Sequence, residues 1–118
     1  MKIPNGNGKK IIYIIGKYRD DTEEKKRDNI WHAVRVACRL WELNWIVFCP
    51  HLNTANFENF TKLADRVWLN GGLEILRRCD AVFVLSNFGD SDGSHEELEL
   101  AKALGLEIFY ESTEMPSK

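Results

Sequence analysis

The chain has 118 residues, of which 44% are hydrophobic and 29% are charged, and its formal net charge is −2. This composition is typical of a globular protein rather than a disordered chain, and the length suits one domain with its own core. The small net charge argues against the general electrostatic attraction that binds nucleic acid polymers or anionic membranes, although a basic loop could still hold one phosphate.

The cysteine pattern and the N-terminal residues predict where the protein works. Cys38, Cys49 and Cys79 form no CxxC pair, and each lies in an apolar run where free Cys behaves as a small hydrophobic residue. We therefore expect reduced thiols and a cytoplasmic protein. No apolar run approaches the roughly 20 residues of a membrane span, so no membrane partner is expected. Residues 1–9 lack the apolar core of a signal peptide and read as a flexible leader.

The first half of the chain predicts a strand followed by a long helix. The run IIYII ends at Gly16 and is typical of a strand buried on both faces. Residues 24–43 then carry apolar side chains at helical spacing, which predicts a stripe that packs on a sheet. Val36, Leu40 and Leu43 lie outside this stripe, an apolar excess that favours a homodimer or larger homo-oligomer. The stripe itself consists of Ile30, Ala33, Val34, Ala37, Cys38 and Trp41.

The second half continues the alternation of strands and helices. Residues 45–49 predict a second buried strand that stops at Pro50, and residues 51–60 form a long loop of a kind that is usually functional. A helix is expected over 63–78 despite Gly71 and Gly72, then a strand over 81–85. A helix from about Ser94 to Leu104 and a strand over 107–110 complete one domain at residues 10–111, which leaves 112–118 as a C-terminal tail.

This alternation predicts a three-layer, doubly wound α/β fold of the flavodoxin-like or Rossmann-like kind. We expect a parallel sheet of four to five strands with helices on both faces. Ligands of such folds bind beyond the carboxyl ends of the strands, where the strand order reverses. The functional loops should therefore be residues 16–21, 50–60 and 86–94.

Glu97 admits two interpretations. In the sequence SHEE, Ser94 and Glu97 have the spacing of a capping box, in which both side chains satisfy backbone N–H groups of the first helical turn. On a helix with about 100° per residue, however, Glu97 falls at the middle of the apolar stripe, while Glu96 and Glu99 fall to the side or toward solvent. A carboxylate in that place would look into the crevice above the strands, so a cap and a catalytic group both remain open.

Four segments in this order resemble the nucleoside 2-deoxyribosyltransferase superfamily, particularly its small deoxyribosyltransferase-like and 2′-deoxynucleoside 5′-monophosphate N-glycosidase-like members. They are YIIGKYR, CPHLNTANF, VWLNGGLEILRRCDAVFVL and SDGSHEELELA. The resemblance covers about residues 10–110. It aligns Gly93, Glu97 and Ala101 with the family's Gly, nucleophilic Glu and Ala, and it implies that Glu97 attacks the anomeric carbon of 2-deoxyribose with Tyr13 beside it. Such a carboxylate forms a glycosyl ester that water or a second base opens.

The resemblance also implies a substrate. Ser91 stands where the monophosphate N-glycosidases use a Ser for phosphate, whereas the nucleoside transferases carry an Asp there. Lys17 or Arg19, in the loop that begins at Gly16, could join Ser91 and the N–H groups that open the following helix around a dianion, and Asp92, Gly93 and Ser94 are included among the expected substrate contacts. We therefore expect a nucleotide rather than a nucleoside, although Lys17 and Arg19 could equally be solvated loop charges.

One position departs from the family. Gly72 replaces an Asp that helps to orient the nucleophile and to move a proton to or from the base. The chain is then either a slow enzyme that uses another acid such as Asp92 or His51, or a noncatalytic nucleotide-binding or sensing module. His51, at the start of the long loop, could contact the ligand or simply bond Asn53 or a backbone carbonyl. Asn53 is included among the expected substrate contacts, and no metal or cofactor is expected, since DSDGS is an incomplete calcium loop.

Overall fold

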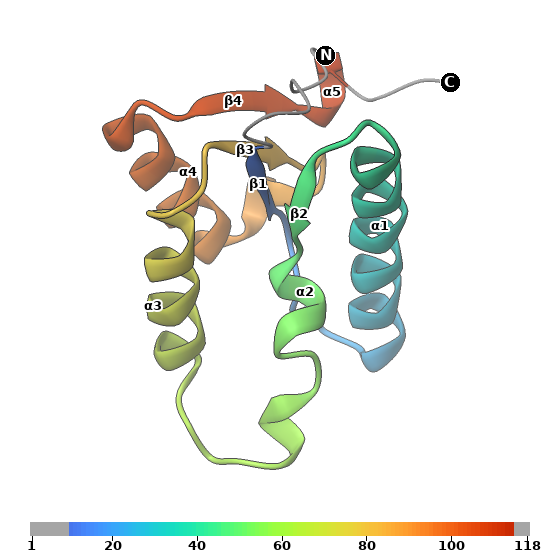
Figure 1. Cartoon of the computed structure of the whole chain (residues 1–118). Coiled ribbons are helices and arrows are strands. Elements are labelled where there is room, and N and C mark those ends of the chain that lie inside the picture. The colour runs from blue at the N-terminus through green and yellow to red at the C-terminus, as the bar shows by residue number, and fades with distance from the viewer. Residues whose placement is uncertain (1–9, 115–118) are drawn as a thin grey trace.

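The computed structural model describes residues 10–114, which form one parallel sheet with helices on both faces (Figure 1). The leader predicted at residues 1–9 lies outside the described residues. The strands are β1 (Ile11–Ile15), β2 (Ile46–Phe48), β3 (Ala81–Val84) and β4 (Glu107–Tyr110). The helices are α1 (Glu23–Glu42), α2 (Pro50–Asn53), α3 (Asp65–Leu76), α4 (Asp92–Leu104) and α5 (Glu111–Glu114), with short 3-10 turns η1 (Phe57–Asn59) and η2 (Phe88–Asp90).

The strand order is β2-β1-β3-β4, and all neighbouring strands are parallel. The predicted doubly wound α/β fold is therefore confirmed. Chain connections run outward from β1 to β2 on one side and from β3 to β4 on the other, so the order reverses between β1 and β3. At this reversal the loops after β1 and β3 diverge and open a crevice beyond the strand ends.

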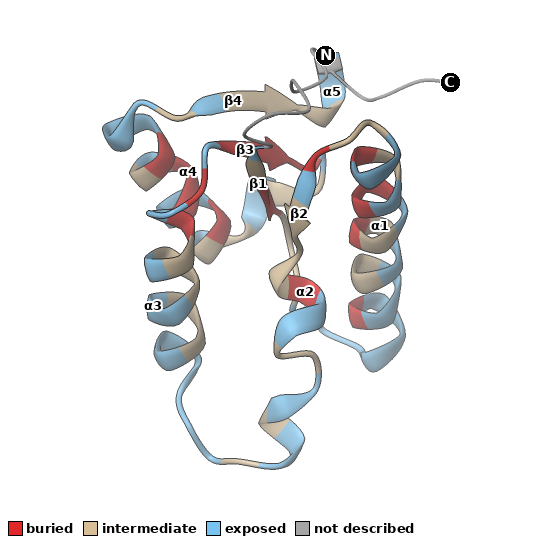
Figure 2. Cartoon of the chain, in the orientation of Figure 1, coloured by how far each residue is buried: buried red, intermediate tan, exposed pale blue. Residues whose placement is uncertain are grey.

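Two apolar clusters hold the layers together. Ile12, Ile14 and Phe83 point to the face covered by α1, whereas Ile15, Val82 and Val84 point to the face covered by α3 and α4. β1 and β3 are central strands and are buried almost throughout, as their continuous apolar runs predict (Figure 2). The strand predicted over 45–49 is present as β2, but it is an edge strand of only three residues with Ile46 exposed, so the prediction that it is buried was wrong.

The buried stripe of α1 also differs from the prediction. Trp41 is 54% exposed and Cys38 is exposed. The buried face instead runs through Lys26, Ala33, Val36, Ala37 and Leu40. The helix is turned toward Val36 and Leu40, which are almost fully buried in the core. Lys26 is buried on the same face, where Glu23 and Glu58 each accept a bond from its ammonium at 2.9 Å.

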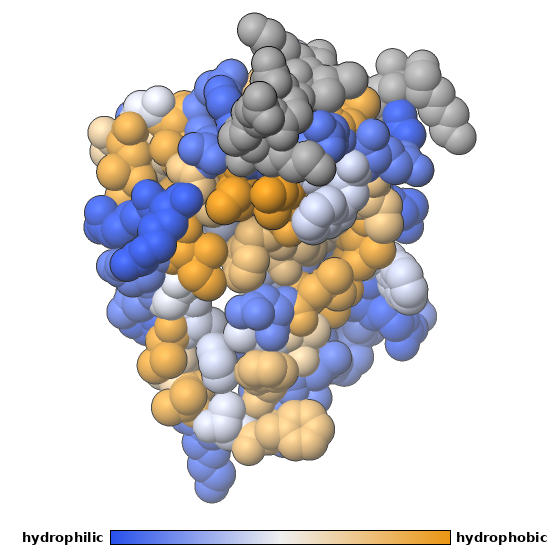
Figure 3. Space-filling view, viewed as in Figure 1, coloured by the Kyte–Doolittle hydropathy of each residue, from blue (hydrophilic) through white to orange (hydrophobic). Residues whose placement is uncertain are grey.

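This rotation removes the stated basis for an oligomer. Val36 and Leu40 belong to the core of the single chain, and Leu43 packs against the same cluster. The exposed aromatic residues on α1 are Trp31 and Trp41. Other apolar side chains are exposed around η1 and the start of α3, on the face shown in Figure 3, namely Phe57, Phe60, Leu63 and Val67.

The C-terminal helix α5 and the contacts of His32 differ from the prediction. α5 begins at Glu111, so the residues expected to start a C-terminal tail are helical as far as Glu114. His32, expected on the helix surface, is half-buried and contacts the Glu111 carboxylate at 2.9 Å. All three cysteines are free thiols, and no helix within residues 10–114 has the length and apolar character needed to cross a membrane.

Candidate functional site

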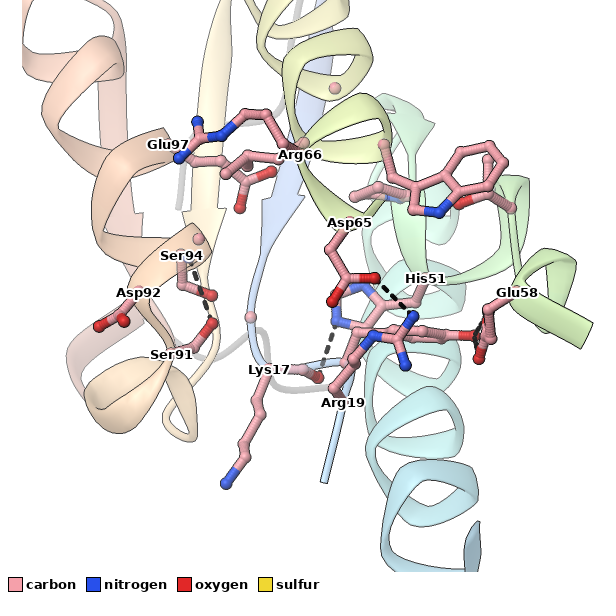
Figure 4. Close-up of a pocket in the computed structure, with 18 of the residues that line it drawn as sticks. Lys17, Arg19, His51, Glu58, Asp65, Arg66, Ser91, Asp92, Ser94 and Glu97 are labelled. Carbon is pink, nitrogen blue, oxygen red and sulfur yellow. Dashed lines mark hydrogen bonds and ion pairs between the residues drawn. The ribbon is translucent and has the colours of Figure 1, made fainter. Parts of the chain in front are cut away.

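A cavity of about 560 Å³ lies beyond the carboxyl ends of β1 and β3, at the reversal of strand order. Its walls come from the loop after β1, from α2 and η1, from the inner face of α3, and from the start of α4. Figure 4 shows Ser91 and Ser94 on one side and Asp65 and Arg19 on the opposite side. The three loops predicted to be functional all contribute to this cavity.

Glu97 lies at the inner end of the cavity. Its side chain comes from the second turn of α4 and is only 8% exposed, whereas Glu96 and Glu99 are exposed, so the predicted inward orientation is confirmed. Tyr13, fully buried in β1, donates its hydroxyl hydrogen to Glu97 Oε2 at 2.5 Å. This contact joins the two residues that the family resemblance associates with each other.

The environment of Glu97 changes its acidity. Burial raises the pKa of Glu97 to about 7, an effect that the hydrogen bond from Tyr13 partly opposes. Burial, and then the Glu97 charge, raise the pKa of Tyr13 far above its ordinary value, so the phenol stays a neutral donor. Burial therefore moves the titration of this carboxyl toward neutral pH, which is where a group that acts in chemistry at that pH needs to titrate.

The start of α4 corrects the capping prediction. α4 begins at Asp92, and its N-cap is Ser91, whose hydroxyl accepts the N–H of Ser94 at 3.2 Å. Ser94 and Glu97 therefore form no capping box, because the N-cap of the helix is Ser91 rather than Ser94 and Glu97 lies beyond the first turn. The Ser94 hydroxyl is instead buried beside the cavity without a hydrogen-bond partner, while Asp92 and Gly93 line the same wall.

Two glycines control how closely the walls approach. A Cβ at Gly72 would lie 2.7 Å from Tyr13 Oη and 3.7 Å from Glu97 Oε2, so the position faces the crevice as predicted. The space is not empty, however, because the Tyr13 hydroxyl fills it. An Asp at this position fits only if the phenol moves. Gly16 has a similar constraint, since a Cβ there would approach the Leu85 side chain to 2.5 Å.

The cations of the loop after β1 are held by carboxylates. Lys17 Nζ lies 2.9 Å from Asp90 and 3.5 Å from Asp20, and in Figure 4 it points away from Glu97. Arg19 lies 2.7 Å from Asp65 at the start of α3. Both residues line the cavity, so they are neither isolated from it nor simply solvated. A phosphate that entered here would have to compete with Asp65 and Asp90 for these cations.

His51 supports the loop rather than facing solvent. It is 3% exposed, and its Nε2 lies 3.1 Å from the carbonyl oxygen of Lys17. Burial lowers the pKa of His51 to about 4, so the ring is neutral and Nε2 donates to that carbonyl. Of the two interpretations left open, the bond to a backbone carbonyl is the one observed, although the ring also lines the cavity. Asn53 is exposed and does not line it.

Several lining residues were missed by the sequence reasoning. Arg66, on α3, makes two bonds to the Glu96 carboxylate at 2.6 and 3.1 Å, which join α3 to α4. Asp65 and Trp68 also line the cavity, and their helical spacing with the predicted Gly72 was the available signal for an inner face. Tyr18 and Glu58 bond each other at 3.1 Å from two different loops. No sequence signal pairs them, because only the tertiary structure brings those loops together.

The chain is similar to known proteins in its sequence and in its fold. Residues 10–111 match the family described as Domain of unknown function (DUF7768). The chain belongs to this family. The DUF7768 chain is also similar to the solved structure of a 2-desoxiribosyltransferase from Leishmania mexicana, with a TM-score of 0.55 and 21% identity. The alignment covers 86% of this chain but only 63% of the Leishmania protein, and at this identity it shows a shared fold. No curated protein gave a match.

Proposed function

We propose that this protein cleaves the N-glycosidic bond of a 2′-deoxynucleoside 5′-monophosphate, with Glu97 as the nucleophile. The observation that carries the proposal is the buried Glu97 carboxyl at the strand-order reversal, held by Tyr13 Oη at 2.5 Å. Attack on C1′ would form a glutamyl-deoxyribosyl ester, and water or a second base would then open it. The fold shared with a 2-desoxiribosyltransferase supports this class of reaction.

The 5′-phosphate is proposed to lie at the mouth of the cavity. The first turn of α4 lines the cavity there, and a helix of 13 residues favours an anion at its N-terminus. The N–H of Ser94 is already bonded to the Ser91 hydroxyl, so the N–H groups of Asp92 and Gly93 would serve the phosphate. Arg19 and Lys17 lie on neighbouring walls and would exchange their carboxylate partners for the phosphate. The sugar would then reach inward toward Glu97.

A second candidate function is a noncatalytic nucleotide-binding or sensing module. One observation favours it: Gly72 provides no carboxyl beside the Tyr13–Glu97 pair. The same cavity would then hold a nucleotide without breaking it.

Base release separates the two candidates. The purified protein is incubated with a panel of 2′-deoxynucleoside 5′-monophosphates that differ in the base, and free base is followed by chromatography. We expect release that Glu97→Gln abolishes, together with a deoxyribosyl adduct on Glu97 detected by mass spectrometry. Glu99→Gln is the matched control, since Glu99 lies exposed on the same helix and contacts Lys102. Binding of nucleotides without release of base from any member of the panel would contradict the enzyme and support the noncatalytic binding module.

A further inference from the structure

The backbone of Lys17 is held on both sides by side chains from other loops. Its N–H donates to Asn87 Oδ1 at 3.1 Å, and its carbonyl oxygen accepts from His51 Nε2 at 3.1 Å. Asn87 follows β3 and His51 lies in α2, after β2, so Lys17 is fixed between the segments that follow the two neighbours of β1. Both bonds use backbone atoms of Lys17 and leave its ammonium to the separate contacts with Asp20 and Asp90.

Asn87 is held in turn by His32, and His32 is held by Glu111. The Asn87 amide nitrogen lies 3.4 Å from His32 Nδ1, and His32 Nε2 lies 3.0 and 2.9 Å from the two Glu111 carboxylate oxygens. The N–H of Ser86 donates to the same carboxylate at 2.7 Å. Neither Asn87 nor His32 lines the cavity. One amide side chain therefore connects the cavity loop after β1 to α1 and α5, outside the cavity.

The donors and acceptors of these bonds fit together in one way. A backbone N–H can only donate, so the end of the Asn87 amide that faces Lys17 is its oxygen. The amide nitrogen then donates to His32 Nδ1, and the ring proton on Nε2 is directed at Glu111. Burial opposes ionisation of Glu111, but the bonds from His32 and from the Ser86 N–H lower its pKa overall, so this carboxylate is an acceptor. His32 with one ring proton thus fixes the orientation of the Asn87 amide.

This arrangement bears on the phosphate end of the proposed site. Lys17 and Arg19 are the cations proposed to receive the 5′-phosphate, and both belong to the loop whose backbone Asn87 holds. A loop that is already fixed loses less conformational freedom when a ligand binds, which strengthens binding. We infer that Asn87 and His32 are positioning residues for the phosphate: Asn87 holds the Lys17 backbone, and His32 sets the orientation of the Asn87 amide. The inference rests on the proposed function and names two residues outside the cavity that serve it.

The test measures binding, so that it does not depend on turnover. Each 2′-deoxynucleoside 5′-monophosphate of the panel and its nucleoside are titrated by calorimetry into the Glu97→Gln protein, and the ratio of the two dissociation constants gives the phosphate preference. Asn87→Leu keeps the branched shape and removes both amide bonds, so it should reduce this preference roughly 3- to 10-fold, the equivalent of one hydrogen bond. His32→Phe should give a smaller reduction. Because it leaves Asn87 in place, it tests the same bonds even if Asn87→Leu fails to fold.

Further variants show whether the effect passes through these bonds. If His32 acts through Asn87, the double variant should lose no more phosphate preference than Asn87→Leu alone. Asp80→Leu is the matched control, since Asp80 Oδ2 accepts the N–H of Ile11 at 2.8 Å at the opposite end of β1. It should lose stability in urea denaturation and keep the phosphate preference. Hydrogen exchange of the Lys17 amide should become faster in Asn87→Leu and His32→Phe and stay unchanged in Asp80→Leu.

The outcomes separate this inference from the function on which it rests. Loss of the phosphate preference in Lys17→Met but not in Asn87→Leu would overturn the inference and keep the proposed phosphate site. Equal losses in Asp80→Leu and Asn87→Leu would also overturn it, because the effect would then follow stability alone. If no base is released but the preference still depends on Asn87, the proposed cleavage fails and the inference holds for a binding module. Equal affinities for monophosphate and nucleoside would overturn both.

Discussion

Tyr13 and Glu97 are 84 positions apart in the sequence, yet the Tyr13 hydroxyl donates to Glu97 Oε2 at 2.5 Å between two buried side chains. The phenol comes from a central strand, so its position is fixed by the sheet. The carboxylate comes from a helix on one face of that sheet. The hydrogen bond therefore sets the orientation of the proposed nucleophile relative to the strand ends.

Removing the Tyr13 hydroxyl is expected to shift the pH dependence of base release. The reaction requires ionised Glu97, so kcat/KM should rise with pH through about 7 in the wild-type protein. Tyr13→Phe removes a bond that lowers the pKa of Glu97, so the rise should move to higher pH. Profiles with a deoxynucleoside lacking phosphate avoid the titration of the substrate itself. Tyr110→Phe, on β4, is the control, and an unmoved profile in Tyr13→Phe would contradict the assignment.

Glu97→Gln is expected to alter how stability depends on pH. The pKa of Glu97 is raised from 4.5 to about 7 on folding, so the folded protein binds this proton more tightly than the unfolded chain. Stability from this group is complete below pH 4.5 and is lost as pH rises through 7. The loss amounts to about 3 kcal/mol, since each unit of pKa corresponds to about 1.4 kcal/mol.

The measurement is the difference in unfolding free energy between Glu97→Gln and wild type, obtained by urea denaturation across this pH range. The difference should move in favour of the variant as pH rises. His51 contributes the opposite slope, because its pKa is lowered from 6.5 to about 4, but it is present in both proteins and cancels. A difference that stays constant from acidic pH to about pH 8 would show that Glu97 is not held in its protonated form.

Adjacent glycines in α3 should respond differently to alanine. Gly71 has nothing within 4 Å of an added Cβ, so Gly71→Ala should gain up to about 1 kcal/mol from helix propensity. Gly72→Ala should lose that gain, since its Cβ must displace the Tyr13 hydroxyl from 2.7 Å. Thermal unfolding of the two variants measures the difference. Equal stabilisation of the Gly71→Ala and Gly72→Ala variants would mean that the Tyr13 phenol moves freely. The rate of base release by Gly72→Ala would then show how that movement affects Glu97.

Ser91→Ala is expected to weaken the preference for a monophosphate over a nucleoside. Loss of the cap should also cost about 1 kcal/mol of stability. Thr22→Ala is the matched control, since Thr22 caps α1 through the N–H of Lys25 and does not line the cavity. We expect both variants to lose similar stability in denaturation, and only Ser91→Ala to lose the ratio of monophosphate to nucleoside turnover. Parallel losses of that ratio would assign Ser91 to capping alone.

The order of elements was predictable because local patterns dictate it. The continuous apolar runs of β1 and β3 are typical of strands buried on both faces, and their alternation with helices predicts a parallel sheet. The inward orientation of Glu97 follows from helical geometry for the same reason, since one turn relates it to neighbouring apolar residues. The resemblance of the motifs then indicated which carboxylate to examine.

Only the tertiary structure decided which polar groups meet. Lys26 is buried on α1 because Glu58, from a loop 32 positions away, supplies a partner that no local pattern indicates. Likewise, the Tyr13 hydroxyl occupies the space beside Gly72 because a strand and a helix approach there, which spacing along the chain does not encode. Periodicity determines which face a residue presents, whereas the pairing of charges and hydroxyls depends on distances between elements that are set only when the layers pack.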